Sequence, residues 1–202
     1  MIKKQYSFLI LSLVFLFSVN NYGQTSKLLI EVQNSFKKLD SFSSDFVQYS
    51  NGKVNLYGKL FFKKPNKMKL DLKNIQITSD GKTVWNYMKK QNKVMINNYD
   101  ESDPSLFTID KFLFDYPSKC VSADQSENGK SFILLTPKED FESFKKAKLY
   151  INDKNELKRI SITDINNNLI EFELKNLKYN LSLVDSDFIF TPPNNSKIID
   201  LR

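Results

Sequence analysis

Alternation of apolar and polar residues between positions 53 and 72 is the feature that most constrains how this chain can fold. Apolar side chains recur with a period of two over two segments, first at Val54, Leu56, Leu60 and Phe62 and then at Met68, Leu70 and Leu72. This period is typical of half-buried antiparallel strands. Lysines fill many of the intervening positions, so the predicted sheet has one apolar face and one lysine-rich face.

Turn signals and further alternation extend this sheet over most of the chain. Asp80-Gly81 predicts a type I′ hairpin, in which both central residues take positive φ. Further strands are predicted at residues 42–49, 93–97, 120–122, 132–136, 147–152, 157–164, 169–177 and 187–190, with Ile198 and Ile199 pairing at an edge. The sequence therefore predicts a mainly β (α+β) fold of about ten antiparallel strands in meander order.

Two segments carry a helical period instead. Residues 25–39 place an apolar stripe on one face, and Thr25 or Ser26 can cap the start of this helix. A second helix is predicted to begin at Asp103-Pro104, with one stripe formed by Leu106, Ile109 and Leu113. Because this second segment is apolar almost all round, we expect it to be buried or to plug a cavity.

Composition excludes most catalytic chemistry. The 202 residues include no histidine and a single cysteine, Cys120, which removes His-dependent acid–base and nucleophilic catalysis and nearly every zinc site. There is no glycine-rich phosphate loop, and the acidic residues do not form pairs suited to acid–base work. We therefore predict no catalytic residues, no metal site, no cofactor and no enzymatic activity.

The net charge and the N-terminal segment predict the compartment of the protein and limit its classes of partner. The net charge is +7, but the lysines are spread along the chain, which favours a solvated face over a nucleic-acid site. Residues 1–23 have two early lysines, a short apolar run and a weakly polar end, the pattern of a cleaved signal peptide. We expect residues 24–202 to form a single domain in an exported compartment, with no nucleic acid as partner.

Four blocks in register resemble the LolA family of periplasmic lipoprotein carriers. Residues 58–68 read GKLFFKKPNKM and residues 79–87 read SDGKTVWNY, similar to the family's G-x-L block that runs through an arginine–proline pair and to its S-D-G-K hairpin. Residues 134–138 (LLTPK) and 188–193 (FIFTPP) resemble two later marks of the family. Together the blocks cover almost the whole chain after residue 23.

The resemblance implies a fold and a task. The fold would be an unclosed antiparallel β-barrel, with an N-terminal helix and a helical lid over an apolar cavity. The protein would be a monomer in the periplasm of a Gram-negative bacterium, carrying acylated lipoproteins from an inner-membrane ABC transporter to an outer-membrane receptor. The expected cavity lining comprises Val54, Leu56, Leu60, Phe62, Met68, Leu70, Leu72, Trp85, Phe172, Leu174, Phe188 and Phe190.

The sequence departs from the family at the latch. The family's arginine before proline, which hydrogen-bonds to the lid backbone, is Lys64 here, and two aromatic positions are Met68 and Leu70. Lysine offers a point charge in place of a planar fork of donors. The resemblance assigns Lys64 to the latch, and Leu106, Ile109 and Leu113 to the lid.

Two other interpretations remain open at the level of sequence. The same fold could bind another lipid or a glycolipid, or serve as a periplasmic sensor of lipoproteins. Alternatively, the apolar residues could fill a closed core in a protein that acts only as an interaction module. A cavity would separate the last interpretation from the others.

Overall fold

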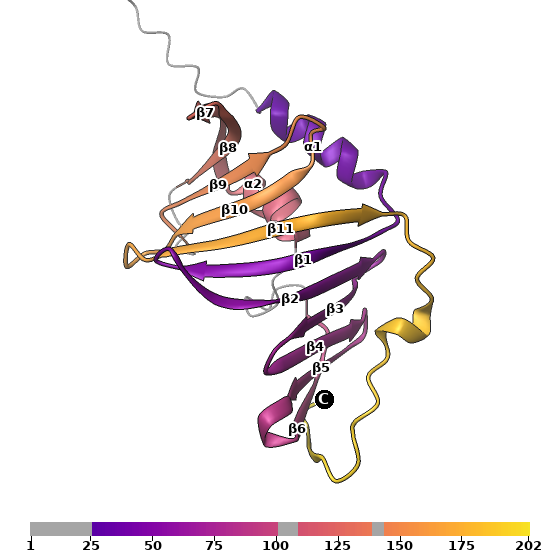
Figure 1. Ribbon diagram of the computed structural model, residues 1–202. Coiled ribbons are helices and arrows are strands. Elements are labelled where there is room, and N and C mark those ends of the chain that lie inside the picture. Colours follow the sequence, from indigo (N-terminus) through magenta and orange to yellow (C-terminus); the bar gives the residue numbers. More distant parts are fainter. Residues whose placement is uncertain (1–25, 101–108, 139–143) are drawn as a thin grey trace, which may run out of the picture.

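The computed structural model describes residues 26–100, 109–138 and 144–202. These residues form one sheet of 12 strands in the order β12-β6-β5-β4-β3-β2-β1-β11-β10-β9-β8-β7. The sheet curves strongly and does not close, because β12 and β7 stand at its two ends (Figure 1). This arrangement confirms the predicted mainly β fold with an unclosed sheet.

Strands account for most of the described chain. Their bounds are β1 Ser41–Ser50, β2 Lys53–Lys63, β3 Lys67–Leu72, β4 Ile75–Asp80, β5 Thr83–Met88, β6 Lys93–Asn98, β7 Cys120–Glu127, β8 Lys130–Pro137, β9 Lys146–Ile151, β10 Leu157–Thr163, β11 Leu169–Tyr179 and β12 Lys197–Asp200. The helical elements are α1 Lys27–Lys37, η1 Lys89–Gln91, η2 Lys111–Asp115, α2 Tyr116–Ser118 and η3 Asp185–Phe188.

The strands form two meanders instead of one. Strands β1 to β6 follow one another across the sheet, and so do β7 to β11. Antiparallel pairing of β1 with β11, in which Phe46 stands opposite Leu174, joins the two halves. Strand β12 runs parallel to β6, with Ile198 opposite Val94, so the predicted edge pairing of Ile198 and Ile199 is confirmed.

The inner face of the sheet, which carries Phe42, Leu60, Leu70 and Leu174, forms the main core together with the helices. Helix α1 buries Leu29, Val32 and Phe36 against this face, because these residues recur at helical spacing. Ser26 caps α1, and its Oγ accepts a hydrogen bond from the Leu29 N–H at 2.8 Å. Helix η2 adds Phe112 and Leu113 to the same core.

Three local predictions need correction or restriction. In the β4–β5 hairpin positive φ falls on Gly81 (90°) and not on Asp80, so the turn is not type I′. Residues 187–190, predicted as a strand, overlap the 3₁₀ helix η3. The second predicted helix, expected to end near Phe114, is helical from residue 109 and continues to residue 118 through η2 and α2, whereas its predicted start, including Leu106, lies outside the described residues.

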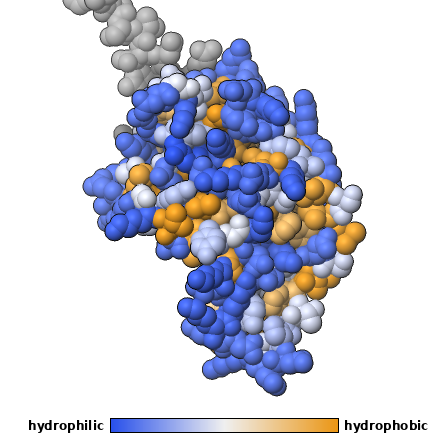
Figure 2. Space-filling model, viewed as in Figure 1, coloured by the Kyte–Doolittle hydropathy of each residue, from blue (hydrophilic) through white to orange (hydrophobic). Residues whose placement is uncertain are grey.

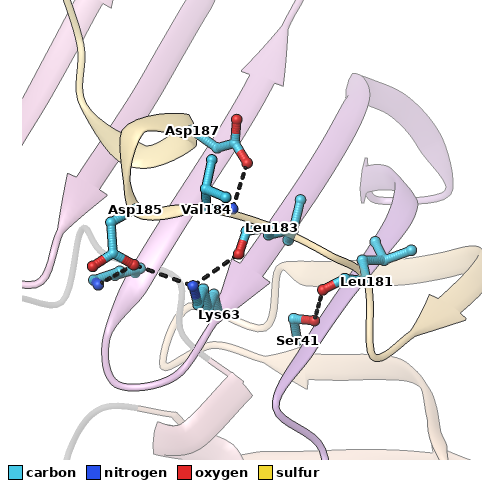
Figure 3. Close-up of polar contacts among 8 residues, drawn as sticks. Ser41, Lys63, Leu181, Leu183, Val184, Asp185 and Asp187 are labelled. Carbon is cyan, nitrogen blue, oxygen red and sulfur yellow. Dashed lines mark hydrogen bonds and ion pairs between the residues drawn. The ribbon is translucent and has the colours of Figure 1, made fainter.

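The opposite, outer face is covered near β3 to β6 by the C-terminal segment, residues 181–200. Lys63 Nζ donates to the Leu183 carbonyl at 2.8 Å, and the Asp185 carboxylate pairs with Lys63 at 3.1 Å and with Lys67 at 2.7 Å (Figure 3). Phe188 is fully buried, and η3 contacts β3 and β4. Part of the lysine-rich face is therefore an internal contact surface.

The remaining surface is mixed in character. Hydrophilic residues predominate in the view of Figure 2, and hydrophobic patches interrupt them. Within the described ranges no helix has the length and apolar character needed to cross a membrane. The described residues also contain no group of three or more histidine, cysteine, aspartate or glutamate side chains that could hold a metal ion.

Candidate apolar binding site

A cavity of about 230 Å³ lies between helix α1, residues 109–113 and one end of the sheet. Its apolar lining comes from α1 (Val32, Phe36), from the segment after it (Leu39), from the inner face (Phe42, Leu157, Leu174, Leu177) and from Ile109 and Leu113. Polar lining residues gather in the β9–β10 connection, at positions 154–156. The site thus combines an apolar interior with a polar rim.

The apolar interior forms where the apolar face of α1 packs against the inward-facing residues of β1 and β11. Val32 and Phe36 lie on the face of α1 that packs on the sheet, and Phe42 and Leu174 lie at inner positions of β1 and β11. Aromatic rings close the space below the helix. The Phe36 ring lies 6.4 Å from that of Phe42, and Phe42 stacks on Phe62 at 5.2 Å. An apolar ligand would therefore meet aliphatic and aromatic groups in the interior of the cavity, away from the polar rim.

Hydrogen bonds join the polar rim to α1 and hold the Glu156 carboxylate in place. Asn155 Nδ2 donates to Glu31 Oε2 at 3.2 Å and so bridges the β9–β10 connection to the helix. Asn152 Nδ2 donates to Glu156 Oε2 at 2.7 Å. Burial first, and then a hydrogen bond to Glu156, raise the pKa of Tyr179 above its usual range, so this phenol stays protonated as a donor.

Lys64 holds the C-terminal end of α1 on the sheet. Its Nζ donates to the carbonyl oxygens of Phe36 at 3.0 Å and of Lys37 at 2.8 Å, and lies 5.4 Å from the centre of the Phe36 ring. These carbonyls belong to the last turn of α1, where the helix dipole favours a cation, and the Phe36 carbonyl also accepts from the Leu39 N–H at 3.1 Å. The resemblance assigned Lys64 to a latch that bonds to the lid backbone, whereas the described hydrogen bonds of its Nζ go to the backbone of α1.

A second polar contact ties α1 to the mid-chain helical segment. Gln33 Nε2 donates to the Leu113 carbonyl at 2.6 Å. Leu113 is completely buried and Ile109 nearly so, and both line the cavity. Ile109 and Leu113 therefore border the cavity opposite the sheet, whereas Leu106, the third residue assigned to the lid, lies outside the described residues.

Most of the expected lining residues lie on the inner face, but only one of the twelve lines the cavity. Leu174 lines it directly. Seven others extend the same apolar core beyond the cavity, namely Leu56, Leu60, Phe62, Met68, Leu70, Leu72 and Phe172. Val54 stands near the start of β2 and is 57% exposed, so it is not part of this core.

Three expected lining residues lie elsewhere, on the outer face. Trp85 packs with Val94, Ile96 and Phe190 in a separate cluster, and Phe188 lies in η3 beside β3 and β4. In β5 the inner positions belong to Val84 and Asn86, because Val84 pairs with Ser79 opposite Met68 on the inner face. Trp85 must therefore point outward, which corrects its assignment to the cavity together with those of Phe188 and Phe190.

Several lining residues were not among the predicted ones. Val32 and Phe36 belong to the apolar stripe of the predicted helix at residues 25–39, but that stripe was not connected with the cavity. Phe42, Leu177 and Tyr179 come together through the β1–β11 pairing, which joins positions more than 130 residues apart. The helical stripe could have identified the first two, whereas no local signal marks the β1–β11 pairing.

Comparisons with known proteins agree with this geometry. The family described as outer membrane lipoprotein carrier protein LolA matches residues 37–191. A Francisella tularensis protein named outer-membrane lipoprotein carrier protein is 24% identical, and the match covers 95% of this chain and 96% of that relative.

Two further relatives are less informative about function. The uncharacterized protein MJ0687 of Methanocaldococcus jannaschii is 28% identical over 96% of this chain, which spans 61% of that relative's length. An uncharacterized conserved protein from Thermus thermophilus has a similar structure, with a TM-score of 0.58 at 10% identity, covering 86% of this chain and 96% of that one. At this identity the likeness shows the fold alone.

Proposed function

Because the chain belongs to the LolA family of outer membrane lipoprotein carrier proteins, we propose that it binds the acyl chains of lipoproteins and carries them from the inner to the outer membrane. The observation that carries this proposal is the apolar cavity between α1 and the inner face of the sheet. No enzymatic step is involved, in keeping with a family of carriers.

The physics of the cargo requires such a site. Moving an acyl chain of about 14 carbons into water costs on the order of 10 kcal/mol, at about 0.8 kcal/mol per CH₂ group. A carrier must replace the membrane with comparable apolar contact. The inner face offers this contact, because its apolar core continues from the cavity to Leu60, Leu70 and Leu72.

The size of the cavity supports a cycle in which α1 moves when cargo binds. A volume of about 230 Å³ is below the roughly 300–1,000 Å³ of pockets that enclose drug-sized ligands. A lipoprotein acyl chain therefore fits only if the cavity extends along the inner face. Helix α1 is the element whose displacement would open that path, because Val32 and Phe36 line the cavity and also pack in the apolar core of the inner face.

The proposed cycle places the protein in the periplasm of a Gram-negative bacterium. Residues 1–23 would direct export and be removed, leaving residues 24–202 as one domain. The proposed partners are an inner-membrane ABC transporter that loads the cargo and an outer-membrane receptor that accepts it. The protein would act as a monomer with no cofactor.

The test is to identify what the exported protein carries. The full chain is expressed in a Gram-negative host, purified from the periplasm without detergent, and analysed by native mass spectrometry. We expect co-purified acylated lipoproteins. A matched variant, Leu177→Glu, puts a charge into the half-buried lining of the cavity, and should fold, as judged by circular dichroism, yet arrive empty.

Other outcomes would support the other interpretations. Free lipid or glycolipid in place of lipoprotein would favour the alternative function as a binder or sensor of other lipids. Equal recovery of lipoproteins with the wild type and with Leu177→Glu would show that the cavity is not the binding site. An empty wild-type protein that also fails to bind an apolar dye would contradict the proposal.

A further inference from the structure

Ser44 carries a buried hydroxyl group that has no hydrogen-bond partner among the described residues. The residue is 3% exposed and lies in β1. Buried hydroxyl groups in folded proteins nearly always have a partner, because they lose their hydrogen bonds to water on burial. An unsatisfied hydroxyl is therefore a position at which a bound ligand can supply the missing contact.

Ser44 belongs to the sheet surface from which the cavity is built. By the alternation of β1 it shares the inner face with Phe42 and Phe46, and it stands opposite Leu60 of β2. On the other side the ladder between β1 and β11 shifts register between Ser43 and Asp45, so that Ser44 faces two residues of β11, Asn176 and Leu177.

This irregularity places Ser44 beside the cavity. Phe42, Leu174 and Leu177, which surround Ser44 on the inner face, all line the cavity. Asn176 takes positive φ (52°), the left-handed conformation that the first residue of a G1-type bulge adopts. Bulges redirect side chains and are frequent next to functional sites.

Ser41, on the same strand, provides a contrast. It is also fully buried, but its Oγ donates to the Leu181 carbonyl at 2.9 Å (Figure 3). Ser44 is instead surrounded on its face by Phe42, Phe46 and Leu60. The two serines are thus a matched pair, one satisfied by the protein and one without a partner in the part of the chain that is described.

We propose that Ser44 is the polar anchor of the acyl site, and that its hydroxyl donates a hydrogen bond to the carbonyl oxygen of an ester-linked or amide-linked acyl chain. This inference rests on the proposed function and specifies its ligand, a carbonyl-bearing acyl chain in preference to an ether-linked alkyl chain. The ether-linked chain of the same length offers the same hydrocarbon but lacks this carbonyl oxygen.

The position of Ser44 along β1 suits such a ligand. Phe42 lies in the cavity next to the polar rim, and Ser44 follows two residues later, about 7 Å farther along the strand. A head group at the rim would thus place its acyl carbonyl near Ser44. The hydrocarbon would continue over Phe46 and Leu60, which belong to the apolar core.

The test uses a diacylglyceryl lipopeptide with two palmitoyl esters and its dialkyl ether analogue. Each is titrated against the mature protein with an apolar fluorescent dye as the displaced reporter. We expect the wild type to bind the ester about tenfold more tightly than the ether, because only the ester carbonyl accepts the Ser44 hydrogen bond. This ratio of affinities corresponds to the upper end of the net free energy of one hydrogen bond. Ser44→Ala should lose this preference by weakening ester binding alone, whereas Ser41→Ala should keep it.

Stability measurements on the empty protein provide a second readout. Ser44→Ala removes an unsatisfied group and should keep or raise the thermal midpoint, whereas Ser41→Ala breaks a hydrogen bond and should lower it. A crystal structure of the wild type with the ester bound should place Ser44 Oγ within 3.5 Å of a ligand carbonyl oxygen. This last measurement does not depend on any variant folding.

The outcomes separate this inference from the proposed function. If the wild type binds neither compound, the carrier proposal itself fails. If it binds both equally, or if Ser44→Ala keeps the ester preference, the carrier proposal stands and the anchor is wrong. A water molecule that satisfies Ser44 in both empty and loaded crystals would likewise overturn the anchor.

Discussion

Replacing Lys64 with alanine should release the C-terminal end of α1 from the sheet. The variant removes two hydrogen bonds, to the carbonyls of Phe36 and Lys37, and the contact of the ammonium group with the Phe36 ring. The site is partly exposed, so each contribution is modest. Together the hydrogen bonds, the favourable cation at a helix C-terminus and the ring contact amount to about 2 kcal/mol.

This free energy corresponds to about a 30-fold increase in the population with α1 detached, since 1.4 kcal/mol is a factor of ten. A detached α1 has 11 residues, and helices of this length are marginal in water. Its backbone amides should therefore exchange with deuterium about 30-fold faster in Lys64→Ala than in the wild type. The variant should also release bound lipopeptide faster, and it should still unfold in one cooperative transition, with a free energy of unfolding lower by about 2 kcal/mol because the unfolded state also lacks these contacts.

Lys63→Ala is the matched control. It removes the same charge from the neighbouring position, but Lys63 points to the outer face and contacts Leu183 and Asp185 (Figure 3). We expect it to leave exchange in α1 unchanged. Lys64→Arg should preserve slow exchange, because guanidinium presents several donors to the same carbonyls. Equal exchange rates in α1 for Lys64→Ala and Lys63→Ala would refute the assignment of Lys64 as the latch.

Three further predictions concern other parts of the fold. A Cβ at Gly58 would lie 2.0 Å from the Asp71 carbonyl oxygen, so Gly58→Ala should cost more than about 3 kcal/mol in urea unfolding, or prevent folding; a loss below 1 kcal/mol would contradict this. Burial raises the pKa of Cys120 to about 11, so its reaction with a thiol reagent at pH 8 should be about 100-fold slower in the folded than in the unfolded protein. Hydrogen bonds from Lys67, and then Lys63, lower the pKa of Asp185. The stability that these contacts contribute is therefore present above the pKa of Asp185 in the unfolded chain, and it is lost as the pH falls through the lower pKa of Asp185 in the folded protein. Acid unfolding followed by the fluorescence of Trp85 should show this loss in the wild type and not in Asp185→Asn.

The inner face could be predicted from the sequence because its signal is local. Period-two alternation fixes which residues share a face, and the structure places Leu60, Met68, Leu70 and Leu72 together in the core as that rule requires. The helical stripe of α1 could be predicted for the same reason, because Leu29, Val32 and Phe36 are spaced by three and four residues.

The cluster of Trp85, Val94, Ile96 and Phe190 on the outer face could not be predicted, because alternation along a strand does not say what covers its outward side chains. Trp85 alternates correctly, but it faces outward, where residues from the distant C-terminal segment cover it. Residues 187–190 alternate like a strand, yet Asp187 Oδ2 accepts a hydrogen bond from the Val184 N–H at 2.8 Å and the chain turns into η3. Both errors arise from contacts that are remote in sequence or specific to one side chain.

A carrier must bind its cargo strongly enough to keep it from water and weakly enough to release it, and the construction of α1 suits this requirement. The three buried side chains of α1, Leu29, Val32 and Phe36, contribute about 5–9 kcal/mol when they pack on the sheet. The Lys64 contacts add about 2 kcal/mol. This total is close to the roughly 10 kcal/mol that an acyl chain of about 14 carbons gains by leaving water. Helix and acyl chain can therefore exchange places on the inner face at small net cost, so that a contact of 1–2 kcal/mol at Lys64 or at Ser44 is large enough to decide whether cargo is held or released.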